Sequence, residues 1–495
     1  MKTGAVILLA ALLAGGLAVG AAPDALRHID VPAAVSSLEE ARMTADPQVA
    51  PSGASEDTGS VPIPEALAPW VSTSIPVISV DTGGTEVLSR ETYVPCTVSA
   101  YGVPKAMALS GSAAGIRVRG NSSSYYGDEK MIRTHAVPYR LRFDEKVNML
   151  GLNGGAECRS WVLLTNRKGA PDAVKNDIAL RIGRMLLGPD GLYCSDSRLV
   201  SLFLNGSFQG VYLLCEQNQV NAHRIKINEP SKGETGVLTG YLAELDEYRE
   251  EPYFRMDYES AAVKDVNGNS GILHASFYSV KSDTYSREQL DFIAGYIRGA
   301  FRILYEACEK GRFLAFDSEY GIAESGSSGA RECVEAAIDI GSAVDMYILY
   351  ELMGDYDAGN SSFFMCVDLS EDSLFPKLTF TAPWDFDLTC SGDPERGLFA
   401  CTFPSLDELH KYGERSNPWF ILLYKQEWFR EMVEERWKQI GGSSGIRRLI
   451  EEERKAVVSF SEDMDRIGGT ASAESLEHLD WIEKRAARLD MLWLK

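Results

Sequence analysis

Carboxylate and amide side chains gather in one stretch of the sequence, Ser342–Cys390. A loop carries Asp357 and Asn360, and a second group, Asp385 and Asp387, flanks a phenylalanine 28 residues further on. Such oxygen ligands suit a hard cation, Mg²⁺ or Ca²⁺, and neighbouring carboxylates repel one another unless a cation lies between them. The stretch therefore predicts a cation site, and the alternative is a solvated acidic loop.

Two short strands must bring these side chains together. Ser362–Asp368 and Lys377–Ala382 are rich in Phe, Val and Thr, and a polar, turn-like segment separates them. If they form a hairpin, the chain returns to its starting point. Asp357, before the first strand, then lies near Asp385 and Asp387, after the second.

The same residues resemble those of protein kinases. Asp357, with Ser362 five positions later, resembles the catalytic loop, in which an Asn occupies the second position. Asp385-Phe386-Asp387 resembles the metal-binding Asp-Phe-Gly. The resemblance is closer to the CotH family of atypical secreted kinases, which is named for a spore-coat protein. It spans about Ile75 to Asp393 and is carried in order by Arg119–Ser123, Tyr139–Phe143, Met149–Leu152, Trp161–Leu164, Leu204–Gly206, Gly210–Leu214 and Glu216–Gln217.

The resemblance implies transfer of the γ-phosphoryl group of ATP to a protein Ser or Thr. Asp357 would orient the acceptor hydroxyl and accept its proton. Asp385 would hold Mg²⁺ or Mn²⁺, with Asn360, Ser362 and Asp387 as supporting ligands. The serine at position 362 departs from the kinase pattern.

Several basic and polar residues are the candidates for nucleotide binding. Three arginines, Arg119, Arg140 and Arg142, are candidate phosphate cations. The loop that carries Asn121 and Ser122 lets backbone N–H groups approach an anion, or it is an ordinary polar turn. Glu216 and Gln217 lie where the resemblance places the adenine base, and a structural carboxylate–amide pair is the alternative. The family usually carries lysines just before and within the strand at 138–143. Here those positions read Ala136, Val137 and Arg142, and arginine does not replace lysine neutrally.

The expected architecture is an α+β fold of the atypical protein-kinase-like, two-lobed kind. The small lobe, residues 75–217, is mainly β and includes one helix, Pro171–Gly188, which resembles the kinase regulatory helix by position. The larger lobe, residues 218–495, is mostly helical and has a helical carboxyl-terminal extension. Apolar spacing predicts its helices at 286–312, 342–354, 419–437, 445–467 and 473–494.

The first residues predict export. Residues 1–22 carry one lysine, an apolar run and a small-residue end, which is typical of a signal peptide, and residues 23–65 read as a flexible linker. No later stretch predicts a transmembrane anchor. Of the nine cysteines, Cys390 and Cys401 flank a loop, and whether they pair stays open.

Composition narrows the partners. A formal net charge of −22 disfavours nucleic acid, because phosphate recognition needs basic surface. The expected partner is an extracellular or surface protein substrate. Two alternatives remain: a non-catalytic coat, adhesin or scaffold protein on the same fold, and a Ca²⁺-stabilised structural site. The substrate and the oligomeric state do not follow from the sequence.

Overall fold

The computed structural model describes residues 60–494 except 73, 166–168, 259–261 and 406–415. Every described residue belongs to one compact unit, Ser55–Lys495. The predicted signal peptide and residues 23–59 of the predicted linker lie outside the described residues. Within the linker's last residues, strand β1, Ser60–Val61, pairs with β4, Val103–Pro104.

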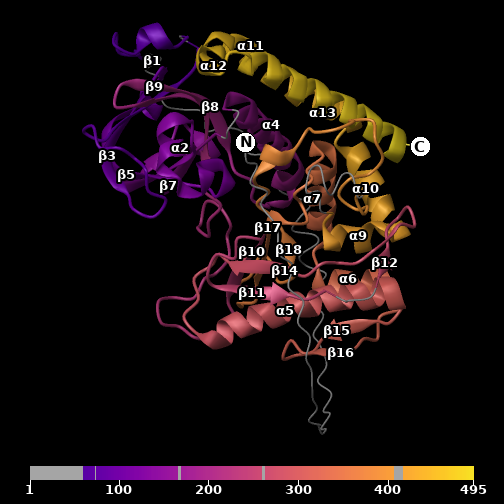
Figure 1. Ribbon diagram of the computed structural model, residues 1–495. Coiled ribbons are helices and arrows are strands. Elements are labelled where there is room, and N and C mark those ends of the chain that lie inside the picture. Colours follow the sequence, from indigo (N-terminus) through magenta and orange to yellow (C-terminus); the bar gives the residue numbers. More distant parts are fainter. Residues whose placement is uncertain (1–59, 73, 166–168, 259–261, 406–415, 495) are drawn as a thin grey trace, which may run out of the picture. The chain divides into compact units, whose positions relative to one another are not determined.

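A closed barrel of seven strands occupies the first half of the described chain (Figure 1). Its order is β2-β3-β5-β6-β7-β9-β8, and the parallel pairing of β2 with β8 closes it. Alternate residues point inward, so Tyr139, Leu141 and Phe143 of β6 are buried while Arg140 and Arg142 face outward. The strands are β2 Val77–Asp81, β3 Val94–Tyr101, β5 Leu109–Val118, β6 Tyr139–Asn148, β7 Glu157–Leu164, β8 Ser197–Leu204 and β9 Ser207–Glu216.

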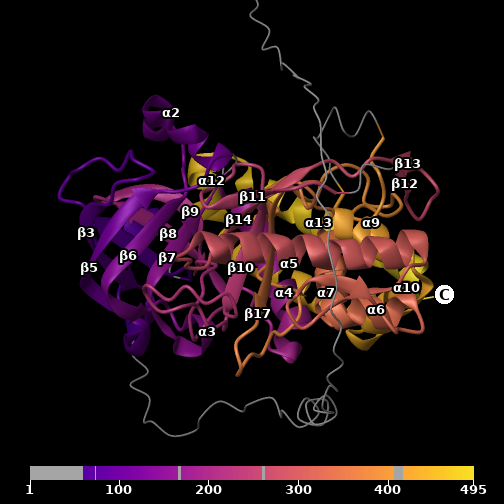
Figure 2. The same cartoon turned by 90° about the horizontal axis from the view of Figure 1, so that it is seen from below.

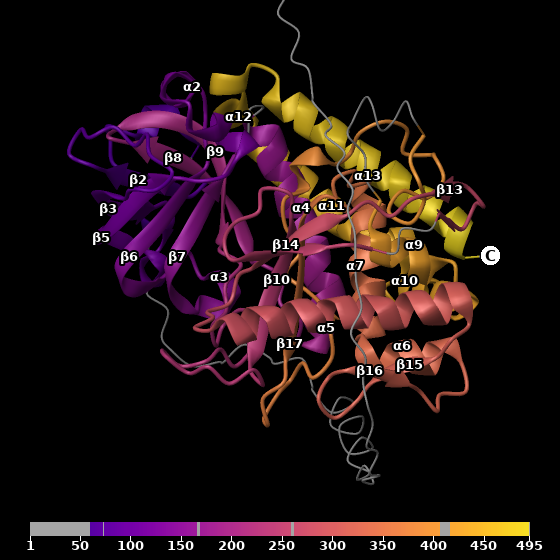
Figure 3. The same ribbon diagram turned by 60° about the horizontal axis from the view of Figure 1, so that its bottom comes forward.

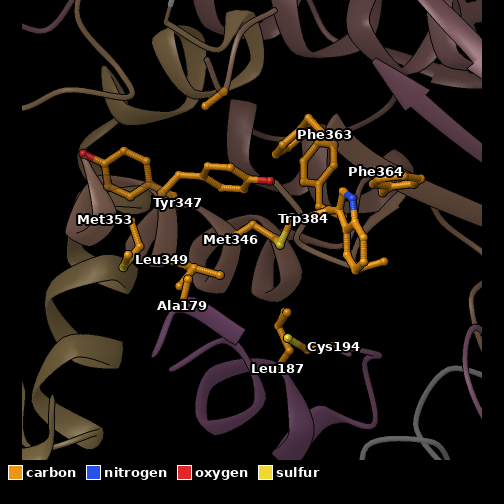
Figure 4. Packing of buried hydrophobic residues seen from close by; sticks show 14 of the residues in the cluster. Ala179, Leu187, Cys194, Met346, Tyr347, Leu349, Met353, Phe363, Phe364 and Trp384 are labelled. Carbon is orange, nitrogen blue, oxygen red and sulfur yellow. The ribbon is translucent and has the colours of Figure 1, made fainter. Parts of the chain in front are cut away.

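Helix α4, Ala170–Leu187, connects β7 with β8 and lies where a helix was predicted at 171–188. Pro171 fits its first turn, where no backbone donor is needed. Almost the whole helix is buried, and the buried residues include four polar ones in its first half: Asp172, Lys175, Asn176 and Asp177. Its apolar residues pack against α7, Ile340–Met353, and in Figure 4 Ala179 and Leu187 face Leu349 and Met346.

A second, five-stranded sheet follows in the order β11-β14-β10-β17-β18. The predicted hairpin is present, because β17 pairs with β18 through Met365 opposite Phe380 and Cys366 opposite Thr379. The second strand is shorter than expected, since Ala382 has a left-handed φ of 54° that ends the extended backbone. The strands are β10 Gly240–Asp246, β11 Tyr253–Met256, β14 Ser276–Val280, β17 Ser361–Asp368 and β18 Thr379–Phe380.

Helices form the remainder of the described chain. Helix α5 runs beside β11 and α6 (Figure 2), while α11 and α13 lie against α4 (Figure 3). The helices predicted at 419–437 and 445–467 are each two helices, because Gln426 is extended and Phe460 leaves the helical conformation. The bounds are α5 Arg287–Tyr305, α6 Ala330–Ala337, α9 Pro418–Tyr424, α10 Glu427–Gln439, α11 Gly442–Ser459, α12 Ser461–Gly468 and α13 Ala471–Trp493.

Smaller elements complete the fold: α2 Glu129–Thr134, α3 Leu152–Gly155, and the two-stranded pairs β12 Val263–Lys264 with β13 Ser270–Gly271 and β15 Leu314–Phe316 with β16 Ile322–Glu324. The α+β class is confirmed. All nine cysteines lie within the described residues as free thiols, so Cys390 and Cys401 do not pair. Over the part of the chain that the structure describes, no helix has the length and apolarity needed to cross a membrane.

Candidate functional site

A cleft of about 840 Å³ lies between one end of the barrel and the second sheet. Residues of the barrel and its loops, among them Arg119, Asn121, Ser122 and Arg140, line one side. The other side is lined by residues of β17 and of the turn that follows β18. The structure therefore brings together two sets of predicted site residues that are more than 200 positions apart in sequence.

The acidic wall is the turn Asp385-Phe386-Asp387. Asp385 has a left-handed backbone, with φ 66° and ψ 61°, and Ser362 Oγ donates a hydrogen bond of 3.3 Å to Asp385 Oδ2. Burial raises the pKa of Asp385, and Arg119 opposes that rise. Burial and the neighbouring Asp385 hold the pKa of Asp387 well above its usual range. Two carboxylates thus lie side by side on one wall of the cleft, where a cation would stabilise both.

Helix α4 holds this turn in place. Asn176 accepts a 3.0 Å hydrogen bond from the Phe386 N–H and donates one of 2.7 Å to Asp387 Oδ1. Lys175 donates to the backbone carbonyl of Asp387 and forms a 2.8 Å salt bridge with Asp172. Sequence analysis did not assign these roles. The available signal was the run of polar residues within an otherwise apolar, buried helix.

The basic wall faces the acidic one. The guanidinium of Arg119 lies 5.5 Å from the centre of the Trp384 ring, directly before Asp385. Arg140 is partly buried, and its Nε has no hydrogen-bond partner among the described residues. The Asn121 side chain accepts a hydrogen bond from Arg90. A buried, unpartnered guanidinium nitrogen beside a polar loop is suited to an anion.

Two residues of the predicted catalytic loop, Asp357 and Asn360, lie at the edge of this arrangement. Asp357 is not among the residues lining the cleft, but it lies close enough to Tyr248, which does line it, to help raise the pKa of that phenol. Asp357 Oδ1 accepts a 3.0 Å hydrogen bond from Asn360 Nδ2, which also donates to Glu247 at 2.5 Å. Asn360 lines a different hollow, of about 330 Å³. It is therefore set apart from the predicted metal ligands Asp385 and Asp387.

Two predicted nucleotide residues also lie away from the cleft. The Glu216 side chain is fully buried, where its Oε1 forms a 2.9 Å salt bridge with Arg224 and accepts from Asn153 Nδ2 at 3.1 Å. This geometry is that of a structural carboxylate, while the next residue, Gln217, does line the cleft. Arg142 points from β6 into a separate hollow, because it is two residues further along the strand than Arg140.

Comparison with known families adds independent information. The CotH kinase protein family matches residues 116–273 and 320–486, about two thirds of the chain. The chain belongs to the CotH kinase family. No curated protein matches it. The two matched segments contain both walls of the cleft, helix α4 and most of the carboxyl-terminal helices.

The acidic turn and Ser362 are the part of this CotH site where a metal ion could be held. Within residues 60–494, where described, no group of three or more His, Cys, Asp or Glu side chains is placed to hold a metal. The site instead offers two carboxylates on the wall of the cleft, the exposed Asp385 and the partly buried Asp387, and the hydroxyl of Ser362. Mg²⁺ is commonly held by one or two carboxylates together with substrate phosphates. The residues present fit a metal ion that arrives with a nucleotide.

Proposed function

We propose that this CotH protein is a secreted protein kinase that transfers the γ-phosphoryl group of ATP to a Ser or Thr hydroxyl of an extracellular or surface protein. One observation carries the proposal: Arg119 of the barrel and the Asp385–Asp387 turn face each other across one cleft. Phosphoryl transfer depends on positioning and charge neutralisation more than on covalent chemistry, and this cleft offers both charge signs.

The residues have distinct roles in this proposal. Arg119 and Arg140 bind the phosphates, and the backbone of the loop at Asn121 and Ser122 covers them. Asp385 and Asp387, held by Asn176, position Mg²⁺ or Mn²⁺. The metal ion, when bound, neutralises charge on the phosphates.

Asp357 orients the acceptor hydroxyl and accepts its proton. Its position supports this role, since it lies at the rim of the cleft beside Tyr248 and close to the buried Asp355. A general base at the rim can meet a protein substrate that enters from solvent, while the phosphates lie deeper in the cleft.

The proposed architecture is the two-lobed kinase arrangement. Residues 75–217 would form the small lobe and residues 218–495 the larger one, with Gln217 where the first passes into the second. The position of α4 supports this view, because it contacts the Asp385–Asp387 turn as a kinase regulatory helix does. Export through residues 1–22 belongs to the same proposal.

A non-catalytic coat, adhesin or scaffold protein is the second candidate. It is favoured by the absence of lysines at 136, 137 and 142 and by the placement of Asn360, which donates to Glu247 and lines a hollow other than the cleft. A protein of this kind would keep the cleft as a binding or structural site and would not turn over.

The test is a phosphorylation assay on the purified chain. The protein is incubated with γ-labelled ATP and Mg²⁺ or Mn²⁺, with and without a Ser-rich protein acceptor, and nucleotide binding is measured in parallel by calorimetry. We expect label on the acceptor or on the protein itself, and none with Asp385→Asn. Wild-type protein that neither binds nucleotide nor transfers label would refute the kinase proposal and leave the scaffold alternative.

A further inference from the structure

A second hollow, of about 750 Å³, lies on the outer face of β5, β6 and β7, and we name it the basic hollow. It shares Arg90, Arg117 and Arg140 with the cleft. Its remaining cations line the hollow alone: Arg142, Lys146 and Arg159, together with His223. None of the cleft's acidic turn residues contributes to it.

Positive charge in the basic hollow is unbalanced. Six arginine and lysine side chains line it, against two carboxylates, Glu91 and Glu157. Among the described residues, only Arg159 of these six forms a salt bridge, a 3.7 Å pair with Glu145 in which both side chains are more than half exposed. Such a concentration of unpaired cations is unexpected in a chain with a net charge of −22.

Strand pairing produces this concentration. Arg117 of β5 stands opposite Arg140 of β6, and Arg142 stands opposite Ser160 of β7. Because Arg140 and Arg142 are two residues apart on one strand, both side chains leave the same face of the barrel. Like charges placed directly opposite each other in a sheet destabilise it, so the arrangement calls for a compensating anion.

Burial makes the need for an anion stronger at two of these residues. The Nε atoms of Arg140 and Arg90 are both buried without a hydrogen-bond partner among the described residues. Burial, and then the neighbouring Arg117, Arg119 and Arg142, lower the pKa of Arg140 despite the opposing effect of Tyr93. A bound anion would accept a hydrogen bond from such a guanidinium and would offset the repulsion from the neighbouring arginines.

We propose that the basic hollow is a second anion site that binds a dianionic phosphate group through Arg142, Lys146 and Arg159, and that it borders the nucleotide phosphates of the cleft at Arg90, Arg117 and Arg140. A dianionic phosphate matches the excess of cations better than a single carboxylate does, and its oxygens match the forked donors of arginine. The lining offers few apolar side chains, namely Tyr93, Cys158 and Ala222, so a bulky apolar ligand does not fit it.

Two sources share this chemistry: a phosphorylated side chain of a protein and a free phosphate ion. The site does not depend on phosphoryl transfer, because Lys146 and Arg159 do not line the cleft. If the proposed kinase function holds, the first source is a protein that already carries phosphoserine. Such a protein could be held through one phosphoserine while another serine reaches the cleft.

Calorimetric titration of the whole chain tests the proposal with three probes: a phosphoserine peptide, the same peptide without phosphate, and inorganic phosphate. The test variant is Lys146→Ala combined with Arg159→Ala. The matched control is Arg133→Ala, an arginine on α2 that pairs with Glu86 and lines neither the cleft nor the basic hollow. We expect the double variant to weaken binding of the phosphorylated probe by roughly tenfold per removed cation, and the control to leave it unchanged.

A second arm separates the two sites. The double variant should bind ATP with Mg²⁺ as wild type does, whereas Arg119→Ala should lose nucleotide affinity and keep the phosphopeptide. Tight binding of the phosphopeptide assigns the site to a protein, and binding of inorganic phosphate alone assigns it to the free ion. The proposal is overturned if neither probe binds, if the unphosphorylated peptide binds equally well, or if the double variant binds phosphate as wild type does.

Discussion

Replacing Asn176 by alanine tests whether helix α4 holds the acidic turn in a form that can bind a nucleotide. Asn176 is 3% exposed, and its side chain makes two hydrogen bonds to the turn, at 3.0 Å from Phe386 N and at 2.7 Å to Asp387 Oδ1. The first is a neutral hydrogen bond, worth about 1 kcal/mol, and the second has a carboxylate acceptor, worth about 1.5–3 kcal/mol.

These bonds oppose a backbone strain in the same turn. The left-handed conformation of Asp385 disfavours a non-glycine residue by about 1–2 kcal/mol. Without Asn176 the turn can relax, while Ser362 and Lys175 continue to hold part of it. If the equilibrium between the relaxed turn and the turn that binds nucleotide shifts by about 1.5–3 kcal/mol toward the relaxed turn, the affinity for ATP with Mg²⁺ becomes roughly 10- to 100-fold weaker.

The assay is calorimetric titration of ATP in the presence of Mg²⁺, with the melting temperature recorded for each protein. Asn228→Ala is the matched control, because its side chain makes one exposed hydrogen bond, at 2.8 Å to Ser370 Oγ, and Asn228 does not line the cleft. We expect Asn176→Ala to lose affinity with a melting temperature only a few degrees lower, since a unit of 441 residues unfolds with an entropy of about 0.9 kcal/mol/K. Unchanged affinity in Asn176→Ala would refute this reasoning.

Three further predictions concern the same cleft and its supports. Asp385→Asn should weaken both the binding of nucleotide with Mg²⁺ and the rate of phosphoryl transfer. Asp357→Asn should leave nucleotide binding unchanged and lower the rate of phosphoryl transfer by about 10²–10⁴-fold. If the two variants behave alike, the assigned roles are wrong. Arg485→Met should lower the free energy of unfolding, measured by denaturant titration, by about 3–5 kcal/mol, because it leaves the buried Glu351 without its ion-pair partner. Arg447→Met is the control: it removes an exposed 3.3 Å pair with Glu483 and should lower the same free energy by less than about 1 kcal/mol. Burial raises the pKa of Glu244 to about 7, although Lys281 opposes the rise. Between about pH 4.5 and 7 the folded protein therefore binds a proton that the unfolded chain has lost, and the free energy of unfolding falls as pH rises, by at most about 1.4 kcal/mol per pH unit. Melting curves of Glu244→Gln should lack this pH dependence.

Local sequence patterns were enough to predict much of the fold. Alternating apolar residues predict the barrel strands at 115–119 and 138–143, which the structure confirms. The turn at Asn205-Gly206 has the positive φ values that this pair favours. The hairpin was predicted from two segments rich in Phe, Val and Thr with a polar segment between them, and the pairing of β17 with β18 confirms it. Helix breaks at Gln426 and Phe460 were missed, because neither residue is a helix breaker by type and tertiary packing decides where each helix ends.

The candidate site was harder to predict because it depends on distant pairs. Ser362, Asp385 and Asp387 came together as the hairpin required. Glu216 did not reach the cleft, since its partner Arg224 lies in a segment whose course could not be foreseen. Arg142 was grouped with Arg140 because alternation puts both on one face, and only the structure shows that this face borders two hollows.

The carboxyl-terminal helices, predicted only as an extension, support the site from behind. Arg485 of α13 forms a fully buried ion pair with Glu351 of α7, the helix that leads into the loop of Asp357. Glu351 in turn accepts hydrogen bonds from the Phe399 and Ala400 N–H groups, at 2.6 and 3.0 Å, in the segment that follows the acidic turn. On α4, Arg181 forms salt bridges of 2.5 and 2.8 Å with Glu452 and Glu453 of α11. Helix α4, which holds the acidic turn, and helix α7, which leads into the loop of Asp357, are thus both tied to the carboxyl-terminal helices by charged pairs. Loss of these helices should therefore disturb the cleft as well as the stability of the fold.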